Sequence, residues 1–234
     1  MRLNKYIARS GLASRRRADR LTLDGSVKIN GVTMTEPGYD VQPGDVVEVS
    51  GRIVEPVEKR VYFMLNKPRG VITTMHDEKD RATVADLMGG VDARVFPVGR
   101  LDYNTTGLLL MTNDGDLANR LAHPSHAVGK TYRARVAGML SEQKIRRLRQ
   151  GIDLGDFVTA PARVRLIRQM PRSAVVDITI YEGKNRQVRR MFKAIGCPVQ
   201  ELQRTAIGEL VLARLREGDY RKLTRAEVEY LKNL

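Results

Sequence analysis

Apolar positions at the start of the chain recur at helical spacing and are interrupted by turn residues. The spacing from Leu3 to Ile7 is typical of a short helix, which Gly11 should end. Ser14 has a side chain suited to capping a second helix, and the Asp24-Gly25 pair should end that helix. The pattern therefore predicts two short helices at the front of the chain.

A set of short strands should follow these helices. Valine and isoleucine residues bracket Asn30-Gly31, a dipeptide that favours the type I′ turn of a β-hairpin. Residues 45–49 are rich in valine and predict another strand. Residues 51–60 are polar and charged, contain proline and lack periodicity, so we expect a linker there. Residues 1–50 should thus form a small module of two helices and a small sheet.

From Val61 onward, strand-like runs alternate with turns and a few helices. The strands are expected at 61–65, 71–74, 95–98, 108–111, 131–136, 164–167 and 174–180. Helical spacing predicts short helices at 84–88, at 116–122 and at 141–148, where Ser141 is a favourable N-cap. Many short strands with few helices predict an α+β domain over 61–234, built on a mixed, mainly antiparallel sheet.

The charge balance narrows the class of partner. With 41 lysines and arginines against 27 aspartates and glutamates, the 234-residue chain has a formal net charge of +14. This excess favours a polyanion, either nucleic acid or an anionic membrane surface. The apolar runs fall far short of the roughly 20 residues that a membrane span needs. We therefore expect nucleic acid, and not a membrane, as the partner. Since no apolar signal region follows Met1, we also expect a cytoplasmic protein.

Basic residues concentrate in two clusters. The first is Arg15-Arg16-Arg17, at the start of the second expected helix, where positive charge opposes the helix dipole. A solvated helix start is the ordinary explanation of such a triplet, but external phosphates account better for the unfavourable placement. The second cluster lies within 184–193 and contains no acidic residue. For most of its members, a phosphate-binding surface is the ordinary interpretation.

One carboxylate stands out in the segment 99–107. Asp102 lies between Gly99 and Gly107, in the company of an arginine and two threonines, shortly before the apolar run 108–111. Glycines let a loop bring its backbone close to a ligand, and such loops carry much of the chemistry of enzymes. The alternative role of Asp102 is to cap a turn. A cation from the second basic cluster would favour a charged carboxylate, which suits a nucleophile or a base.

Other chemistries lack their signatures in this sequence. The chain has no Walker loop, no Gly-x-Ser-x-Gly motif and no dinucleotide fingerprint. His123 and His126 have the spacing of a metal-ligand pair, but no further cysteine or histidine nearby would complete a zinc site. The single cysteine, Cys197, is expected to be a small buried apolar residue. We therefore expect a reaction that uses neither a metal nor a cofactor.

Three separated motifs resemble those of the RsuA/RluB family of ribosomal RNA pseudouridine synthases. They are, in order, Asn66-Lys67-Pro68-Arg69-Gly70, Gly99-Arg100-Leu101-Asp102 and the segment 182–191. Residues 1–50 also resemble the alpha-L RNA-binding module first described in a protein of the small ribosomal subunit. The two resemblances cover nearly the whole chain. They imply an alpha-L module linked to a pseudouridine synthase catalytic domain.

The resemblance also implies roles for individual residues. In the family, the motif aspartate is essential, the tyrosine of a Lys-Thr-Tyr segment stacks on the target base, and a basic residue after Gln-Val pairs with the aspartate. In this sequence these residues are Asp102, Tyr132 and Arg189. For Tyr132, packing in the core is the alternative. The residues expected to bind RNA are Arg2, Lys5, Arg15, Arg16, Arg17, Lys67, Arg69, Arg100, Lys184, Arg186 and Arg190.

The reaction that the resemblance implies is the site-specific isomerisation of uridine to pseudouridine in ribosomal RNA. The motifs favour large-subunit RNA, and small-subunit RNA and a non-catalytic RNA-binding ribosome-assembly factor are the alternatives. Three routes stay open for Asp102, which could attack C1′ of the sugar, add to the base or remove a proton. The expected partner is a uridine that is single-stranded or flipped from a structured stem-loop, in rRNA or a ribosome assembly intermediate. We expect a monomer.

Overall fold

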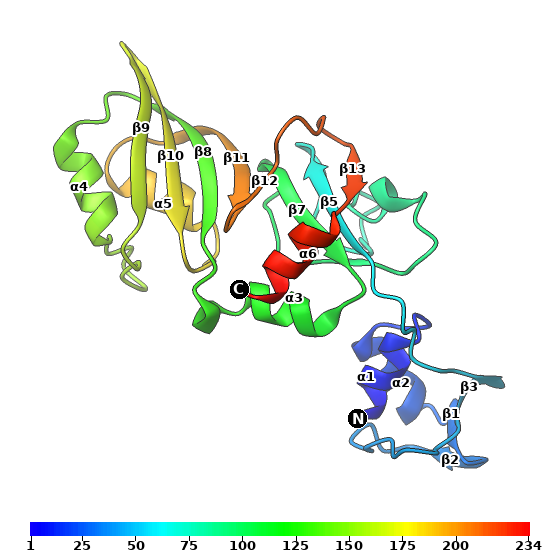
Figure 1. Ribbon diagram of the computed structural model, residues 1–234. Coiled ribbons are helices and arrows are strands. Elements are labelled where there is room, and N and C mark those ends of the chain that lie inside the picture. Colours follow the sequence, from blue (N-terminus) through cyan, green and yellow to red (C-terminus); the bar gives the residue numbers. More distant parts are fainter. The chain divides into compact units, whose positions relative to one another are not determined.

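A computed structural model describes residues 1–234, apart from the side chain of Pro124. The chain divides into two compact units (Figure 1). The front unit comprises Met1–Arg60 and Asp92–Arg94, and the large unit comprises Val61–Val91 and Val95–Leu234.

The front unit contains two helices followed by a small antiparallel sheet. The helices are α1 (Leu3–Arg9) and α2 (Arg15–Leu23), and the sheet has the order β2-β1-β3-β4 with strands β1 (Val27–Ile29), β2 (Val32–Met34), β3 (Val47–Val49) and β4 (Arg52–Ile53). Ser14 caps α2 as predicted, since its side chain accepts a hydrogen bond from the backbone N–H of Arg17. Asn30 and Gly31 have positive φ angles of 52° and 81°, as the type I′ turn requires.

The segment expected to be a linker contributes to the front unit instead. Its residues 52–53 form β4, which pairs with β3. Val54 is buried in the core of the unit, and the backbone N–H of Val57 donates to the carbonyl of Arg9. The prediction was wrong there because a two-residue edge strand is too short to produce a periodic pattern.

The large unit is built on a nine-stranded mixed sheet with the path β13-β5-β7-β11-β8-β10-β9, on which β6 pairs with β7 and β12 with β11. The strands are β5 (Tyr62–Lys67), β6 (Phe96–Pro97), β7 (Thr106–Thr112), β8 (Lys130–Ala137), β9 (Arg163–Met170), β10 (Ser173–Ile180), β11 (Val199–Ile207), β12 (Leu210–Val211) and β13 (Tyr220–Lys222). The β7–β11 pair is parallel, and the other pairs in this sheet are antiparallel. This arrangement confirms the α+β class.

Helices cover parts of the sheet and bury its apolar residues. They are the 3₁₀ turns η1 (Asp86–Met88) and η2 (Pro124–His126) and the helices α3 (Gly115–Ala122), α4 (Glu142–Gln150), α5 (Gln187–Ala194) and α6 (Arg225–Lys232). Helices α4 and α5 lie beside β8, β9 and β10 (Figure 1), and their buried side chains share one core cluster with those strands. Helices α3 and α6 share a second cluster with β7.

One strand prediction and one helix prediction in the large unit need correction. Residues 71–74 form no strand, and only an isolated bridge joins Ile72 to Thr83. Thr73 instead donates a hydrogen bond from its hydroxyl to the carbonyl of Leu101, and this bond holds residues 71–74 outside the sheet. The expected helix at 84–88 is the short 3₁₀ turn η1.

Gly107 marks the place where β7 meets β11. Its φ is +105°, and a Cβ atom built on it would lie 2.2 Å from the carbonyl oxygen of Arg204. Only glycine permits this approach of the two backbones. The close contact brings the start of β7, and with it the Asp102 loop, next to β11.

Candidate active site

The loop that carries Asp102 enters β7 and is held in place by a buried hydroxyl. Thr73 Oγ1 donates to the carbonyl of Leu101 at 2.8 Å and accepts from the Leu101 N–H at 3.2 Å. The N–H of Thr105 donates to the carbonyl of Asp102 at 3.0 Å, which closes a turn around the carboxylate. The backbone of Asp102 is thus fixed on both sides, while its side chain remains 31 % exposed.

Lys67 lies fully buried beneath the same loop. Its Nζ donates to the carbonyls of Pro68, at 2.9 Å, and Thr105, at 3.1 Å. Burial lowers the pKa of Lys67 to about 8, although the charges of Asp102 and Glu217 partly oppose the shift. The expectation that Lys67 contacts RNA was wrong, because its ammonium group is enclosed by protein. From this position, Lys67 supports the loop that carries Asp102.

Arg189 reaches Asp102 from the first turn of α5. Its NH2 donates to the carbonyl of Asn104 at 2.8 Å and to Thr105 Oγ1 at 3.2 Å, and its Nε lies 3.9 Å from Asp102 Oδ2. The Arg189 side chain is only 14 % exposed, and burial lowers its pKa from the ordinary value while the nearby carboxylate opposes this shift. The fold thus brings together two residues that are far apart in the sequence.

The turn before α5 determines where Arg189 points. Arg186 adopts the left-handed conformation, with φ of 48°. The buried Gln187 then donates from Nε2 to Glu182 Oε1 at 2.6 Å and accepts from the N–H of Lys184 at 3.1 Å. These bonds fix the first turn of α5 against the chain that precedes it.

Asp102, Tyr132 and Arg189 line one cleft with a volume of about 150 Å³. Tyr132 is half-buried on β8, where it lies opposite Arg204 of β11 and Ile178 of β10. The structure therefore brings together all three residues for which the family resemblance implied a catalytic role.

Positive charge surrounds the entrance of the cleft. Arg100, Lys184 and Arg186 line it with exposed side chains. Arg69 is also exposed, and together with Arg186 it acts on the pKa of Arg189 by repulsion, which places it near the same site. These four residues have the exposure that contact with phosphates requires.

Arg190 contacts other protein groups. Its guanidinium pairs with the carboxylate of Asp156, donates to the carbonyl of Leu154 at 3.1 Å and lies 5.2 Å from the centre of the Phe157 ring. The expectation of RNA binding by Arg190 is not supported, because its donors already serve to hold the 154–157 loop against α5.

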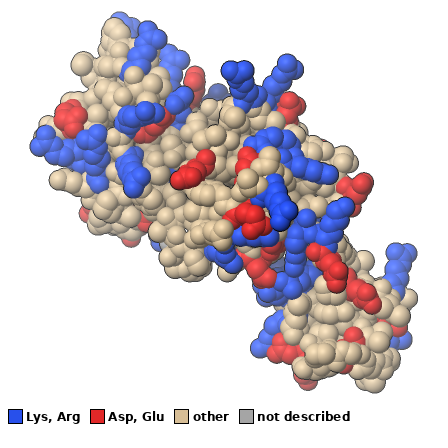
Figure 2. Space-filling view, in the orientation of Figure 1, with Lys and Arg blue, Asp and Glu red and all other residues tan. Residues whose placement is uncertain are grey.

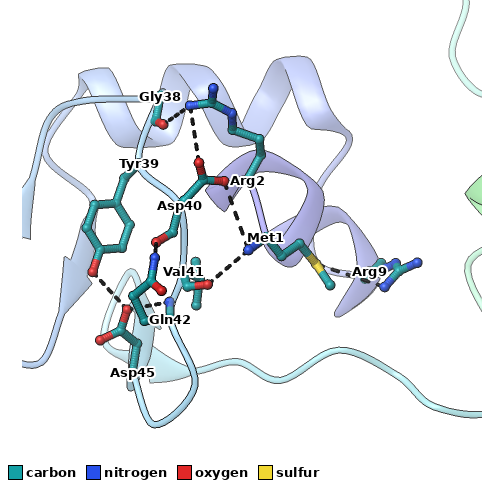
Figure 3. A network of polar contacts seen from close by, with 9 residues as sticks. All are labelled: Met1, Arg2, Arg9, Gly38, Tyr39, Asp40, Val41, Gln42 and Asp45. Atoms are coloured by element: carbon teal, nitrogen blue, oxygen red, sulfur yellow. Dashed lines mark hydrogen bonds and ion pairs between the residues drawn. The ribbon is translucent and has the colours of Figure 1, made fainter.

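In the front unit, Arg2 belongs to a network at the N-terminus (Figure 3). It bonds to the carbonyl of Gly38 and lies 3.7 Å from the carboxylate of Asp40, while the amine of Met1 donates to Val41 at 3.0 Å. The guanidinium of Arg2 thus already has protein partners, so it is less available to bind a phosphate.

The other basic candidates of the front unit lie on its two helices. Lys5 is half-buried on α1, whereas Arg15, Arg16 and Arg17 are exposed on the first turn of α2. Figure 2 shows lysine and arginine side chains over the surfaces of both units. The arginine triplet is therefore the part of the front unit that is best suited to bind phosphates.

The structure adds two cleft residues that the sequence reasoning missed, Lys130 and Arg204. Lys130 is the lysine of the Lys-Thr-Tyr segment, so the motif that identified Tyr132 could also have identified Lys130. Arg204 is 4 % exposed on β11, a strand for which no prediction was made, and its Nε donates to the carbonyl of Leu108 at 2.7 Å.

Among the described residues, no group of three histidine, cysteine or carboxylate side chains is placed to hold a metal ion. Within the same residues, no helix is both long and apolar enough to cross a bilayer.

Comparison with known proteins relates both units to characterised families. Residues 61–194 match the family model of the RNA pseudouridylate synthases, and residues 1–47 match the S4 domain. The chain is 47 % identical over 235 residues to "Ribosomal large subunit pseudouridine synthase B" of Bacillus subtilis, covering 100 % of this chain and 96 % of that protein. It is 42 % identical over 233 residues to an uncharacterised RNA pseudouridine synthase of Aquifex aeolicus, covering 99 % of this chain and 93 % of that one.

A solved structure described as a pseudouridylate synthase is also similar over the full length. It superposes with a TM-score of 0.72 at 34 % identity, covering 99 % of both chains. The resemblance of sequence therefore extends to the arrangement of the chain.

Proposed function

Since this chain belongs to the RNA pseudouridine synthase family, we propose that it isomerises one specific uridine of large-subunit ribosomal RNA, with Asp102 as the catalytic carboxylate. The observation that carries the assignment of the carboxylate is its geometry: Asp102 lies 3.9 Å from Arg189 in a cleft that Tyr132 also lines. The choice of large-subunit RNA rests on the name of the Bacillus relative, which shares the full length of this chain.

The isomerisation needs no change of oxidation state. The bond between N1 of uracil and C1′ of ribose breaks, the ring turns, and C1′ bonds to C5 of the same ring. C5 loses a proton and N1 gains one, so the atoms balance. A carboxylate, a platform for the base and a means of holding the RNA meet these requirements.

Each part of the cleft fits one requirement. Asp102 is the carboxylate, and its three possible routes remain attack at C1′, addition to the base and removal of a proton. Arg189 positions that carboxylate and supplies positive charge beside it. Tyr132 provides a ring on which the flipped base can stack, which offsets part of the few kcal/mol that flipping costs. The exposed Arg100, Lys184 and Arg186 would contact the flanking phosphates.

The S4 domain of the front unit would contribute affinity. Its exposed Arg15, Arg16 and Arg17 suit the backbone of a structured stem-loop, either in free rRNA or in a ribosome assembly intermediate. Because the two units are tethered, binding by one raises the effective concentration of the other at the RNA. We further propose that the enzyme acts as a monomer in the cytoplasm.

Chemical mapping of pseudouridine tests this function. The purified protein would be incubated separately with unmodified large- and small-subunit rRNA, and carbodiimide adducts that resist alkali would be mapped by primer extension. We expect one new adduct in the large-subunit RNA and none with Asp102→Asn. A new adduct only in the small-subunit RNA would overturn the substrate assignment. Binding of rRNA with no adduct in either RNA would favour a non-catalytic assembly factor.

A further inference from the structure

Two positively charged side chains lie deep in the cleft without a role in the function proposed above. Lys130 is the first residue of β8 and Arg204 lies on the neighbouring β11. Lys130 and Tyr132 are two residues apart on one strand, and Tyr132 lies directly opposite Arg204. All three side chains therefore project from the same face of the sheet, and all three line the cleft.

Neither cation has a carboxylate partner among the described residues. Arg204 is 4 % exposed, its Nε donates to the carbonyl of Leu108, and its buried NH2 has no hydrogen-bond partner. Burial lowers the pKa of Lys130 from its ordinary value, and the charge of Arg204 adds to this effect. Two like charges in a recess are unfavourable unless something negative joins them. The arrangement therefore calls for negative charge from a ligand.

We propose that Lys130, backed by Arg204, stabilises the negative charge that uracil carries while it is detached from the ribose. When the bond between C1′ and N1 breaks, its electron pair stays with the base and spreads over N1, O2 and O4. The pair at C5 later forms the new bond to C1′, the C5 proton leaves, and N1 takes up a proton. This inference rests on the function proposed above and assigns Lys130 as a further catalytic residue of the same reaction.

The depth of the two cations favours the base over a phosphate as their partner. The cations at the entrance, Arg100, Lys184 and Arg186, are exposed, whereas Lys130 is half-buried and Arg204 is buried. A flipped base enters the recess beside Tyr132, but its phosphates remain with the RNA backbone outside. A charge deep in such a site acts through a low dielectric and needs little reorganisation, so it stabilises a transition state strongly.

The two cations serve different parts of this task. Lys130 has a flexible stem, and its ammonium group can reach a carbonyl oxygen of uracil. Arg204 is held by Leu108 and is a positioning residue. Its charge repels the Lys130 ammonium, so it directs that group toward the cleft and the incoming base.

The test compares the rate of the chemical step with RNA affinity in Lys130→Met. With enzyme in saturating excess, we expect pseudouridine to form roughly 100-fold or more slowly than in the wild type, as after removal of one stabilising donor. The dissociation constant for the RNA and its salt dependence should stay within twofold of the wild-type values. Lys130→Arg, which keeps the charge, should recover part of the rate.

Lys232→Met is the matched control. It also removes one lysine charge from the large unit, but Lys232 lies on α6, pairs with Glu229 at 3.4 Å and does not line the cleft. Its rate and its affinity should both match those of the wild type.

A better leaving group separates catalysis from a structural role. Fluorine at C5 withdraws electrons and stabilises the uracil anion, so RNA with 5-fluorouridine at the target should need Lys130 less. We expect the deficit of Lys130→Met, measured as consumption of the target nucleoside in a single turnover, to shrink at least tenfold, to about 10-fold or less. An equal deficit with both nucleosides would indicate a structural effect and overturn the inference.

Two further outcomes would contradict it. A wild-type rate at saturation, combined with weaker binding and a salt slope reduced by about one, would mean that Lys130 contacts a phosphate. A wild-type rate with unchanged binding would mean that Lys130 has no part in the reaction. If the wild-type chain itself forms no pseudouridine, the proposed function fails and this inference fails with it.

Discussion

The two units of this protein hold their positive charges in different ways. In the front unit, Arg15, Arg16 and Arg17 are exposed on the first turn of α2. In the large unit, Lys67 and Arg204 are buried and Arg189 is 14 % exposed, and all three are bonded to backbone carbonyls. Exposed charges contribute affinity that salt weakens, whereas buried and bonded charges fix geometry and act on the reacting groups. We therefore expect substitution of the exposed arginines in the front unit to change RNA affinity. Substitution of the buried cations in the large unit should instead change the reaction rate or the stability.

Arg189→Met is the strongest test of the buried charges. Removal of the guanidinium leaves Asp102 without its partner and frees the Asn104 carbonyl and the Thr105 hydroxyl that Arg189 now holds. We expect the single-turnover rate to fall by about 10² to 10³-fold with little change in RNA affinity. Arg190→Met on the same helix is the control and should stay within tenfold of the wild-type rate, because Arg190 pairs with Asp156. Equal losses in both variants would contradict the role of Arg189.

The buried charges also depend on the close contact between β7 and β11. Gly107→Ala would place a Cβ atom 2.2 Å from the Arg204 carbonyl oxygen at a φ of +105°. We expect the free energy of unfolding, measured by denaturant titration, to fall by roughly 3 kcal/mol or more. Gly138→Ala has a φ of +80° but nothing within 4 Å, so it should cost only about 1 kcal/mol. Similar costs at both positions would mean that the contact is not rigid.

Lys67 should make the stability of the large unit depend on pH. Its pKa of about 8 in the folded state lies below the ordinary value of 10.5, so the unfolded chain binds more protons between these two pH values. The free energy of unfolding contributed by Lys67 should therefore rise with pH, by roughly 2 kcal/mol from pH 7 to pH 9.5. Subtracting the curve of Lys67→Met from that of the wild type isolates this rise. A flat difference would show that Lys67 is not held in a buried site.

The exposed arginines should change affinity alone, and by less. Replacing Arg15, Arg16 and Arg17 together by glutamine should weaken RNA binding roughly 10-fold at low salt. The slope of log affinity against log salt should become shallower by about 2 to 3. Arg2→Gln should change that slope by less than one, because Arg2 is already engaged with Gly38 and Asp40. If Arg2→Gln changes that slope by one full unit, the distinction between charges that already have protein partners and charges that are free to bind RNA would be wrong.

Local features of the sequence were predictable where local interactions decide the structure. The Ser14 cap and the Asn30-Gly31 turn form as expected because each depends on neighbouring backbone groups. The Asp102 loop was recognisable from its glycines and from the family motif. Its approach to Arg189 matches what the resemblance implied, although no local pattern states a distance.

The features that escaped prediction depend on the tertiary structure. Lys67 is a charged residue in a turn motif, which usually means exposure, yet the fold encloses it beneath the Asp102 loop. In strand β11, burial alternates from Leu202 to Ala206, but the charged Arg204 occupies one of the buried positions, so the sequence shows no apolar alternation there. Arg204 and its place in the cleft were therefore not visible in the sequence.

The most direct test of the central claim is the single-turnover rate of Asp102→Asn. The asparagine has nearly the same shape as the aspartate but carries no charge, so the loop and its bonds to Thr73 through Leu101 should be retained. We expect RNA affinity within twofold of the wild type and pseudouridine formation reduced by at least about 10³-fold. A rate within tenfold of the wild type would show that Asp102 is not the catalytic carboxylate.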